Sequence, residues 1–121
     1  MNTQKTILVA EDDPVLREAY GRAFAASGYK IRMAEDGEMA IQMIEEEAPD
    51  LLICDIMMPK KDGWAVLDSF PKGKRSFPII MVTNLEDDKS RKKCKDLADG
   101  YFVKKDMTLH FLRTMAKTLL D

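Results

Sequence analysis

Three features that would point to particular classes of protein are missing from this sequence. Its two cysteines in 121 residues are too few for the disulfide framework of a small secreted domain. Nineteen basic against 21 acidic residues leave a net charge of −2, with no basic excess for general nucleic-acid binding. The N-terminus does not read as a signal peptide, and no window approaches the roughly 18 apolar residues of a membrane span. We therefore expect a cytoplasmic domain that binds neither nucleic acid nor membrane directly.

The composition is that of one folded domain. A length of 121 residues, at 13.8 kDa, predicts a single domain over residues 1–121. The 45% of hydrophobic residues can fill a core without cross-links, and the 33% of charged residues can cover the surface. We expect either a stand-alone domain or one domain of a longer chain.

Short runs of apolar and β-branched residues recur along the chain and predict five strands. The runs are residues 6–10, 30–33, 51–54, 79–82 and 101–103. The first, third and fourth are continuously apolar, as in strands that are buried on both faces of a parallel sheet. The second alternates between apolar and polar residues, which predicts an edge strand.

Segments with helical spacing separate these runs. The first begins after Asp13, which can cap it. Four more helices are expected after Asp36, after Asp62, within 86–98 and after Asp106. The strict alternation of strand and helix predicts an α/β fold with a doubly wound parallel sheet. Such sheets bind ligands beyond the carboxyl ends of their strands, so the residues there are candidates for function.

Polar side chains follow four of the five predicted strands. They are Glu11 and Asp12 after the first strand, Asp55 after the third, Thr83 after the fourth and Lys104 after the fifth. Two carboxylates 4 Å apart repel by about 4 kcal/mol at an effective dielectric constant of about 20, so the acidic cluster favours a bound cation. Oxygen ligands without a nearby histidine or thiolate favour Mg²⁺ or Mn²⁺ over zinc or copper.

The same residues can support phosphoryl transfer. The Lys104 ammonium can offset charge on the phosphoryl oxygens, and the Thr83 hydroxyl can donate a hydrogen bond to one of them. A carboxylate can attack phosphorus to give an acyl phosphate, and Asp55 on the central strand is best placed to do so.

In the order and spacing of its motifs, the sequence resembles the receiver domain of two-component response regulators. The stretches that carry the resemblance are residues 7–13 (ILVAEDD), 55–63 (DIMMPKKDG), 78–83 (PIIMVT) and 99–104 (DGYFVK). Each is weak alone, but four in the right order are a strong signal. The resemblance covers essentially the whole chain and implies a flavodoxin-like five-stranded parallel sheet, in the order 2-1-3-4-5, with five helices.

The resemblance implies a role for each residue that binds metal or phosphoryl groups. Asp55 matches the phosphoacceptor. Glu11 and Asp12 match the acidic pair that binds Mg²⁺, and Asp12 is the more direct ligand. The backbone carbonyl of Met57 matches a further contact to the metal.

The resemblance also implies how the domain signals. Thr83 and Lys104 match the residues that contact the phosphoryl group, and Tyr101 matches an aromatic switch that turns inward when the hydroxyl moves. The phosphoryl group would come from a sensor histidine kinase or a histidine phosphotransfer protein. The output would be a downstream protein partner or effector domain. Such a domain is a switch that hydrolyses its own phosphoaspartate, and it is not an enzyme acting on other substrates.

Four positions depart from the family pattern. Lys105 stands where the family usually has proline, so we expect a trans peptide bond after Lys104, because a cis bond without proline costs roughly 2.5–4 kcal/mol. Asn84 stands where the family favours a small residue, which predicts narrower access to the site. Met57 and Leu85 are apolar at two positions that modulate attack by water in the family.

Two other functions are open from the sequence. A degenerate receiver would act as a constitutive adaptor, an interpretation that depends on Lys105 and Asn84. A Mg²⁺-dependent phosphatase of the haloacid dehalogenase type would use similar residues, but it has an Asp-x-Asp motif after the first strand, and here 55–57 lacks the second aspartate.

The basic residues within 89–95 also have two interpretations. A run of lysine and arginine on a helix is usually a solvated face. In this family, however, the fourth and fifth helices and the fifth strand meet partners. We therefore also consider a docking surface that includes Lys92 and Lys93.

Overall fold

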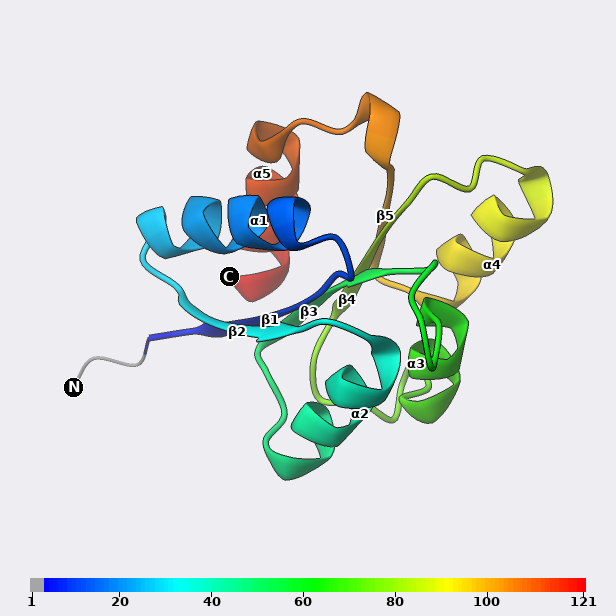
Figure 1. The fold of residues 1–121 in the computed structure, drawn as a ribbon, viewed down its shortest axis with the longest axis horizontal. Coiled ribbons are helices and arrows are strands. Elements are labelled where there is room, and N and C mark those ends of the chain that lie inside the picture. Colours follow the sequence, from blue (N-terminus) through cyan, green and yellow to red (C-terminus); the bar gives the residue numbers. More distant parts are fainter. Residues whose placement is uncertain (1–3) are drawn as a thin grey trace.

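The five apolar runs pair into one parallel sheet (Figure 1). The computed structural model describes residues 4–121. The strands are β1 (Thr6–Ala10), β2 (Lys30–Ala34), β3 (Leu51–Asp55), β4 (Ile79–Thr83) and β5 (Gly100–Val103), in the order β2-β1-β3-β4-β5. This topology confirms the predicted doubly wound α/β fold, and β2 lies at an edge as its alternating sequence predicts.

Helices cover both faces of the sheet. They are α1 (Pro14–Ala26), α2 (Gly37–Glu46), α3 (Gly63–Ser69), α4 (Asp88–Leu97) and α5 (Leu109–Leu120), with a 3₁₀ turn η1 (Lys104–Asp106) between β5 and α5. Each α-helix begins after a side chain that accepts a hydrogen bond from its first turn. The predicted cap Asp13 is confirmed, and Asp62 caps α3 in the same way. Within residues 4–121, no helix has both the length and the apolar character needed to cross a membrane.

The core consists of two apolar layers, one on each side of the sheet. Helices α1 and α5 pack on one face, and α2, α3 and α4 pack on the other (Figure 1). Every residue of β3 and β4 is buried, as the continuously apolar runs predict. This packing holds the carboxyl ends of the central strands rigidly at one edge of the molecule.

Arg75, which lies between α3 and β4, ties the end of α4 to the rest of the fold. Its side chain is only 3% exposed. The guanidinium donates hydrogen bonds to the carbonyls of Phe70 (2.9 Å), Phe77 (3.1 Å) and Leu97 (3.1 Å), and to the Asp99 carboxylate (2.7 Å). Leu97 is the last residue of α4, so this end of the helix is fixed by a buried cation.

Candidate functional site

Three acidic side chains meet at the carboxyl ends of β1 and β3. Each of Glu11, Asp12 and Asp55 offers a carboxylate oxygen, and these oxygens lie within 4.8 Å of one another. Together with Met57 and Lys104, they line an open cavity of about 500 Å³. Glu11 and Asp55 are buried and Asp12 is exposed, so the cluster has a buried floor and one acid at its mouth.

Lys104 joins two of these acids. Its Nζ atom lies 2.8 Å from Glu11 Oε1 and 3.0 Å from Asp55 Oδ2. Burial opposes the charge of Lys104, but hydrogen bonds and charges from Glu11 and Asp55 outweigh it and raise the lysine pKa. No peptide bond within 4–121 is cis, so the bond after Lys104 is trans as predicted, and the side chain reaches the site without a proline at position 105.

The Glu11 carboxyl is the most perturbed acid of the cluster. Burial, assisted by the charge of Asp55, raises its pKa to about 7, against the opposing effects of Lys104 and of the Asp13 N–H. That N–H donates to Glu11 Oε2 at 3.1 Å. A carboxyl held in this way carries a proton over part of the neutral pH range, and a cation bound beside it would displace that proton.

Local backbone contacts fix the orientation of Asp55. Its Oδ1 accepts a hydrogen bond from the backbone N–H of Ile56 at 2.7 Å, while Oδ2 faces Lys104. The backbone of Gly63 packs against the same strand end, and its N–H donates to the Ile56 carbonyl at 2.7 Å. A side chain at Gly63 would overlap the Asp55 carbonyl oxygen, which explains the glycine at the end of the 55–63 motif.

One residue that contacts the acidic pair was not predicted. Arg17, in the first turn of α1, donates from Nη1 to the carbonyl of Glu11 at 2.8 Å. This bond anchors the backbone between the two acids. An arginine soon after an acidic pair is compatible with this contact, but the sequence does not reveal that it binds the backbone rather than a carboxylate.

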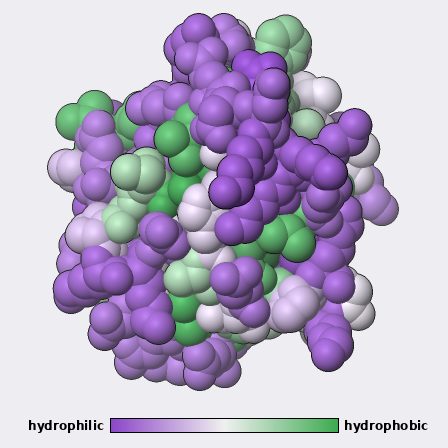
Figure 2. All heavy atoms as spheres, turned by 90° about the vertical axis from the view of Figure 1, so that its right-hand side faces the viewer, coloured by the Kyte–Doolittle hydropathy of each residue, from purple (hydrophilic) through white to green (hydrophobic). Residues whose placement is uncertain are grey.

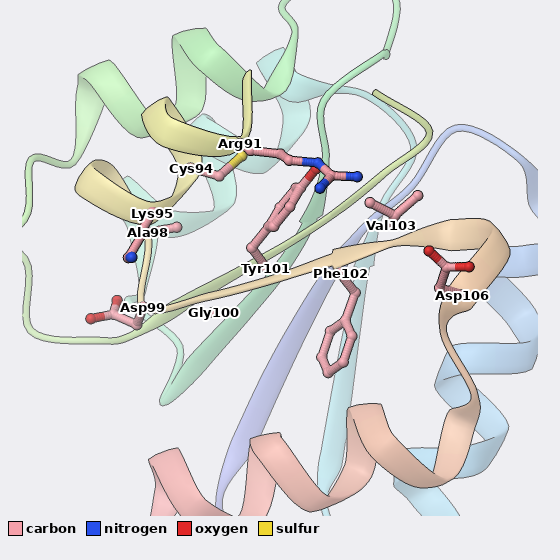
Figure 3. Close-up of a pocket in the computed structure, with 10 residues that line it drawn as sticks. All are labelled: Arg91, Cys94, Lys95, Ala98, Asp99, Gly100, Tyr101, Phe102, Val103 and Asp106. Carbon is pink, nitrogen blue, oxygen red and sulfur yellow. The ribbon is translucent and has the colours of Figure 1, made fainter. Parts of the chain in front are cut away.

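Thr83 and Tyr101 lie beside the cavity rather than among the residues that line it. Thr83 is fully buried, and its Oγ1 accepts a hydrogen bond from the Leu85 N–H at 3.1 Å. Tyr101 donates from its hydroxyl to the Leu85 carbonyl at 2.8 Å. The Tyr101 ring extends from β5 toward α4, where Arg91 reaches over it, and Phe102 points to the other face of the sheet (Figure 3).

The four positions that depart from the family pattern are all at or near the cavity. Asn84 and Lys105 border it, as does Met57, which is 63% exposed. Lys105 forms an ion pair of 2.8 Å with Glu86, so the segment after β5 is joined to the segment after β4. Leu85 is partly buried and packs against the core, with its backbone bound by Thr83 and Tyr101.

Comparisons with known proteins agree with this arrangement. The chain is 33% identical over 108 residues to a cyclic di-GMP phosphodiesterase of Thermotoga maritima and 32% identical over 114 residues to the response regulator MprA of Mycobacterium ulcerans. These alignments cover 89% and 94% of this chain, but only 29% and 49% of the relatives, so the chain spans less than half of their length.

A solved structure is similar over nearly the whole chain. The response regulator protein TrrA of Thermotoga maritima, solved in complex with Mg²⁺-BeF, has a TM-score of 0.85 and 34% sequence identity, covering 97% of this chain and all of that one. The family model described as the response regulator receiver domain matches residues 7–117. A parallel sheet in the order 2-1-3-4-5, an acidic cluster at its carboxyl edge and this match agree: the chain belongs to the response regulator receiver domain family.

Proposed function

We propose that this chain is a two-component signalling switch that accepts a phosphoryl group on Asp55, with Mg²⁺, from a sensor histidine kinase or histidine phosphotransfer protein in the cytoplasm. The observation that carries the proposal is the shared position of Asp55. One of its carboxylate oxygens lies within 4.8 Å of carboxylate oxygens of Glu11 and Asp12, and Oδ2 contacts the Lys104 ammonium at 3.0 Å. A nucleophile, a cation site and a fixed positive charge therefore meet in one cavity.

The residues present fit a magnesium ion. Three carboxylate oxygens within 4.8 Å of one another are hard ligands, and no histidine or cysteine belongs to the cluster. In the proposal, Glu11, Asp12, Asp55 and the carbonyl of Met57 hold the ion, and Mn²⁺ could replace it. When bound, the ion would neutralise charge on the transferring phosphoryl group.

Asp55 supplies the nucleophile. One of its carboxylate oxygens forms a bond to phosphorus while the bond from phosphorus to the donor histidine nitrogen breaks, and the electron pair of that bond leaves with the imidazole. The Ile56 N–H and Lys104 hold the carboxylate in one orientation before the reaction, which lowers the entropy cost of reaching the transition state.

Lys104 and Thr83 would stabilise the product. The Lys104 ammonium remains next to Asp55 and can pair with the phosphoryl oxygens. The Thr83 hydroxyl accepts a hydrogen bond from Leu85, so its own hydrogen is available for donation to a phosphoryl oxygen. Movement of that hydroxyl would disturb Leu85, and Leu85 also binds Tyr101.

The output surface in this proposal is the face formed by α4 and β5. A cavity of about 520 Å³ lies between them, with Tyr101, Cys94 and Ala98 among its lining residues and Arg91 and Lys95 at its basic side (Figure 3). The view onto the α4 side of the molecule shows a mostly hydrophilic surface with small hydrophobic areas (Figure 2). A downstream protein or effector domain whose binding depends on the position of Tyr101 would dock here.

Lys92 and Lys93 of the basic run differ in their contacts. Lys92 is exposed, but Lys93 Nζ lies 4.4 Å from the centre of the Trp64 ring and so stabilises the contact between α4 and α3. Neutralising Lys89 and Lys92 is therefore the cleaner test of docking. If the surface docks a partner through its charges, these substitutions should weaken partner binding, and the difference from the wild type should become smaller as salt is added. Unchanged partner binding would leave the run as a solvated face.

Phosphorylation itself can be tested by intact-protein mass spectrometry. The protein is incubated with acetyl phosphate and Mg²⁺, and we expect a mass increase of one phosphoryl group, which should be absent when the metal is chelated before acetyl phosphate is added. Asp55→Asn should remove the adduct, whereas Asp68→Asn, an exposed aspartate of α3, should keep it. An unmodified wild-type protein that also fails to bind beryllium fluoride would favour the degenerate adaptor instead.

The proposal also includes the absence of enzymatic turnover on other substrates. In the proposal the phosphoryl donor is a phosphohistidine, with acetyl phosphate as its substitute in the test, and a phosphoester is neither of these. Incubation with a small phosphoester should therefore release no more product than there is protein. Product in excess of protein would favour the phosphatase alternative.

A further inference from the structure

The strand β5 is bordered by a cavity on each face of the sheet. The cavity of about 520 Å³ between α4 and β5 is lined by every residue from Ala98 to Val103, so it follows the strand over its whole length. A cavity of about 350 Å³ lies between β5 and α5, on the other face. Tyr101 extends toward the first cavity, and the ring of Phe102 extends toward α5 (Figure 3).

The backbone of β5 has hydrogen-bonding groups on its outer side. The strand lies at one end of the sheet and, among residues 4–121, pairs only with β4. Successive residues of a strand direct their N–H and C=O groups to opposite sides, so alternate residues of β5 direct theirs away from β4. A free strand edge of this kind is a template for pairing with a further strand.

The cavity on the α4 side has an excess of positive charge. Arg91 and Lys95 line it, and neither forms an ion pair with another residue of the described chain. Two acids also line it, but Asp99 is paired with Arg75 at 2.7 Å, and Asp106 lies beyond the end of the strand. A side chain that enters this cavity from an added strand would therefore bind best if it were acidic.

The cavity on the α5 side is apolar. Its lining residues are Phe102, Phe111, Met115 and two threonines, and none of them is charged. Phe111 is 56% exposed, so a large apolar surface is open there. Because side chains of a strand alternate between the two faces of a sheet, a strand added to β5 would direct every second side chain into each cavity. The edge therefore matches a segment in which acidic and apolar residues alternate.

We propose that β5 binds an extended segment of a partner protein as a further strand, with acidic side chains toward α4 and apolar side chains toward α5. A second copy of this chain does not match the edge, because its own β5 has the sequence GYFV and carries no acid. The inference rests on the proposed function in that it names the partner of the α4–β5 surface. Binding is therefore measured first without metal or phosphoryl analogue.

The probe is a short fluorescent peptide of alternating valine and glutamate, titrated with the whole chain and followed by fluorescence anisotropy. We expect saturable binding, and binding about tenfold weaker for the same peptide with N-methylated amides, which lacks the donors that strand pairing needs. In the complex, NMR should show slower hydrogen exchange at the alternate amides of β5 that are directed away from β4.

Two substitutions test the chemistry of the two cavities. Lys95→Glu should weaken binding of the valine–glutamate peptide by about fivefold and strengthen binding of a valine–lysine peptide, whereas damage to the fold would weaken both. Lys74→Glu, at an exposed lysine before β4, should change neither. Phe111→Ser should also weaken binding of the valine–glutamate peptide, and Val15→Ser, at an exposed residue of α1, should not.

Three results would decide against this edge as a peptide site. They are a valine–glutamate peptide that does not bind, equal binding of its N-methylated form, and protection of the β5 amides in a dimer of the chain alone. Mg²⁺ with beryllium fluoride is then added to the wild-type complex, where we expect the affinity for the peptide to change. Binding with protected β5 amides that this addition leaves unchanged would support the strand pairing and contradict its control by Asp55, which belongs to the proposed function.

Discussion

Thr83 and Tyr101 hold the same residue, Leu85, by its two backbone groups. The Leu85 N–H donates to Thr83 Oγ1 at 3.1 Å, and the Leu85 carbonyl accepts from the Tyr101 hydroxyl at 2.8 Å. Thr83 ends a central strand beside the acidic cavity, whereas Tyr101 lies against α4. A change at the proposed phosphoryl site therefore has a short physical route to the α4–β5 face, through one peptide unit on each side of Leu85.

Removing the Tyr101 hydroxyl should loosen this route without affecting the chemistry. Tyr101→Phe loses one partly buried hydrogen bond, which contributes about 0.5–1.5 kcal/mol. Hydrogen exchange of the amides around Leu85 should then become faster, by up to about tenfold, while the rate of labelling by acetyl phosphate stays the same. Tyr29→Phe is the control, and equal exchange in both variants would argue against a role for Leu85 as the link.

In the absence of metal, the free energy of unfolding should decrease as the pH rises from the unperturbed pKa of Glu11 through its pKa in the fold. Its pKa is 4.5 unperturbed and about 7 in the fold, so between these values the native state binds more protons than the unfolded state. Unfolding by urea in chelator should show a loss of at most about 3 kcal/mol from this group between about pH 5 and about pH 8. The loss should be absent below the unperturbed value and complete only once the pH has passed the pKa of about 7 in the fold.

Glu11→Gln provides the comparison for that experiment. The variant cannot ionise at this position, so its stability should be nearly independent of pH over the same range, and Mg²⁺ should stabilise it less than the wild type. Glu45→Gln, an exposed glutamate of α2, should behave like the wild type. A wild-type curve that is flat between the two pH values would contradict the raised pKa.

A methyl group at Gly63 should disturb Asp55, the proposed phosphoacceptor. The added Cβ would overlap the Asp55 carbonyl oxygen and lie 2.7 Å from the Ile56 Cα atom, and both are backbone atoms of the central strand end. Forcing atoms into such a packed position costs about 1–3 kcal/mol, and we expect a lower melting temperature together with slower labelling of Asp55. Ala65→Gly in the same helix should reduce stability by about 1 kcal/mol but leave the labelling rate unchanged.

Lys60 offers a stabilising substitution close to the site. Among residues 4–121, it is the only residue other than glycine with a positive φ, at 67°. Its ion pair with Asp36 is long, at 3.8 Å, and the lysine side chain is 64% exposed, so the pair contributes little. Asparagine tolerates the left-handed conformation better, so Lys60→Asn should raise stability by about 0.5–1 kcal/mol in urea unfolding. Lys61→Asn, next to it, should give no such gain.

The sequence predicts those features that depend on local patterns. The apolar runs place Asp55 and Thr83 at strand ends, and the caps Asp13 and Asp62 follow from their position before helical segments. The motif spacing brings Glu11, Asp12, Asp55 and Lys104 to one edge because parallel strands end together there.

Contacts that depend on the packing of distant segments could not be predicted. Arg17 binds the carbonyl of Glu11, although arginine in a helix usually faces solvent. Tyr20 lies on the buried face of α1, and only the structure shows that its hydroxyl has no hydrogen-bond partner among residues 4–121. Lys93 belongs to a basic run that reads as a solvated face, yet it lies over Trp64, which is far away in the sequence. In each case the local sequence is compatible with several partners for the polar atom, and tertiary packing determines which of them it contacts.

The buried guanidinium of Arg75 holds the C-terminal end of α4 in place. Its bonds to the carbonyls of Phe70, Phe77 and Leu97 clamp the helix where it finishes, while the beginning of the helix follows the loop that carries Leu85. A helix that is held at its C-terminal end moves most readily by rigid-body rotation about that end. A displacement of Leu85 should therefore turn α4 as a lever, with the largest travel near Asp88 and almost none near Leu97.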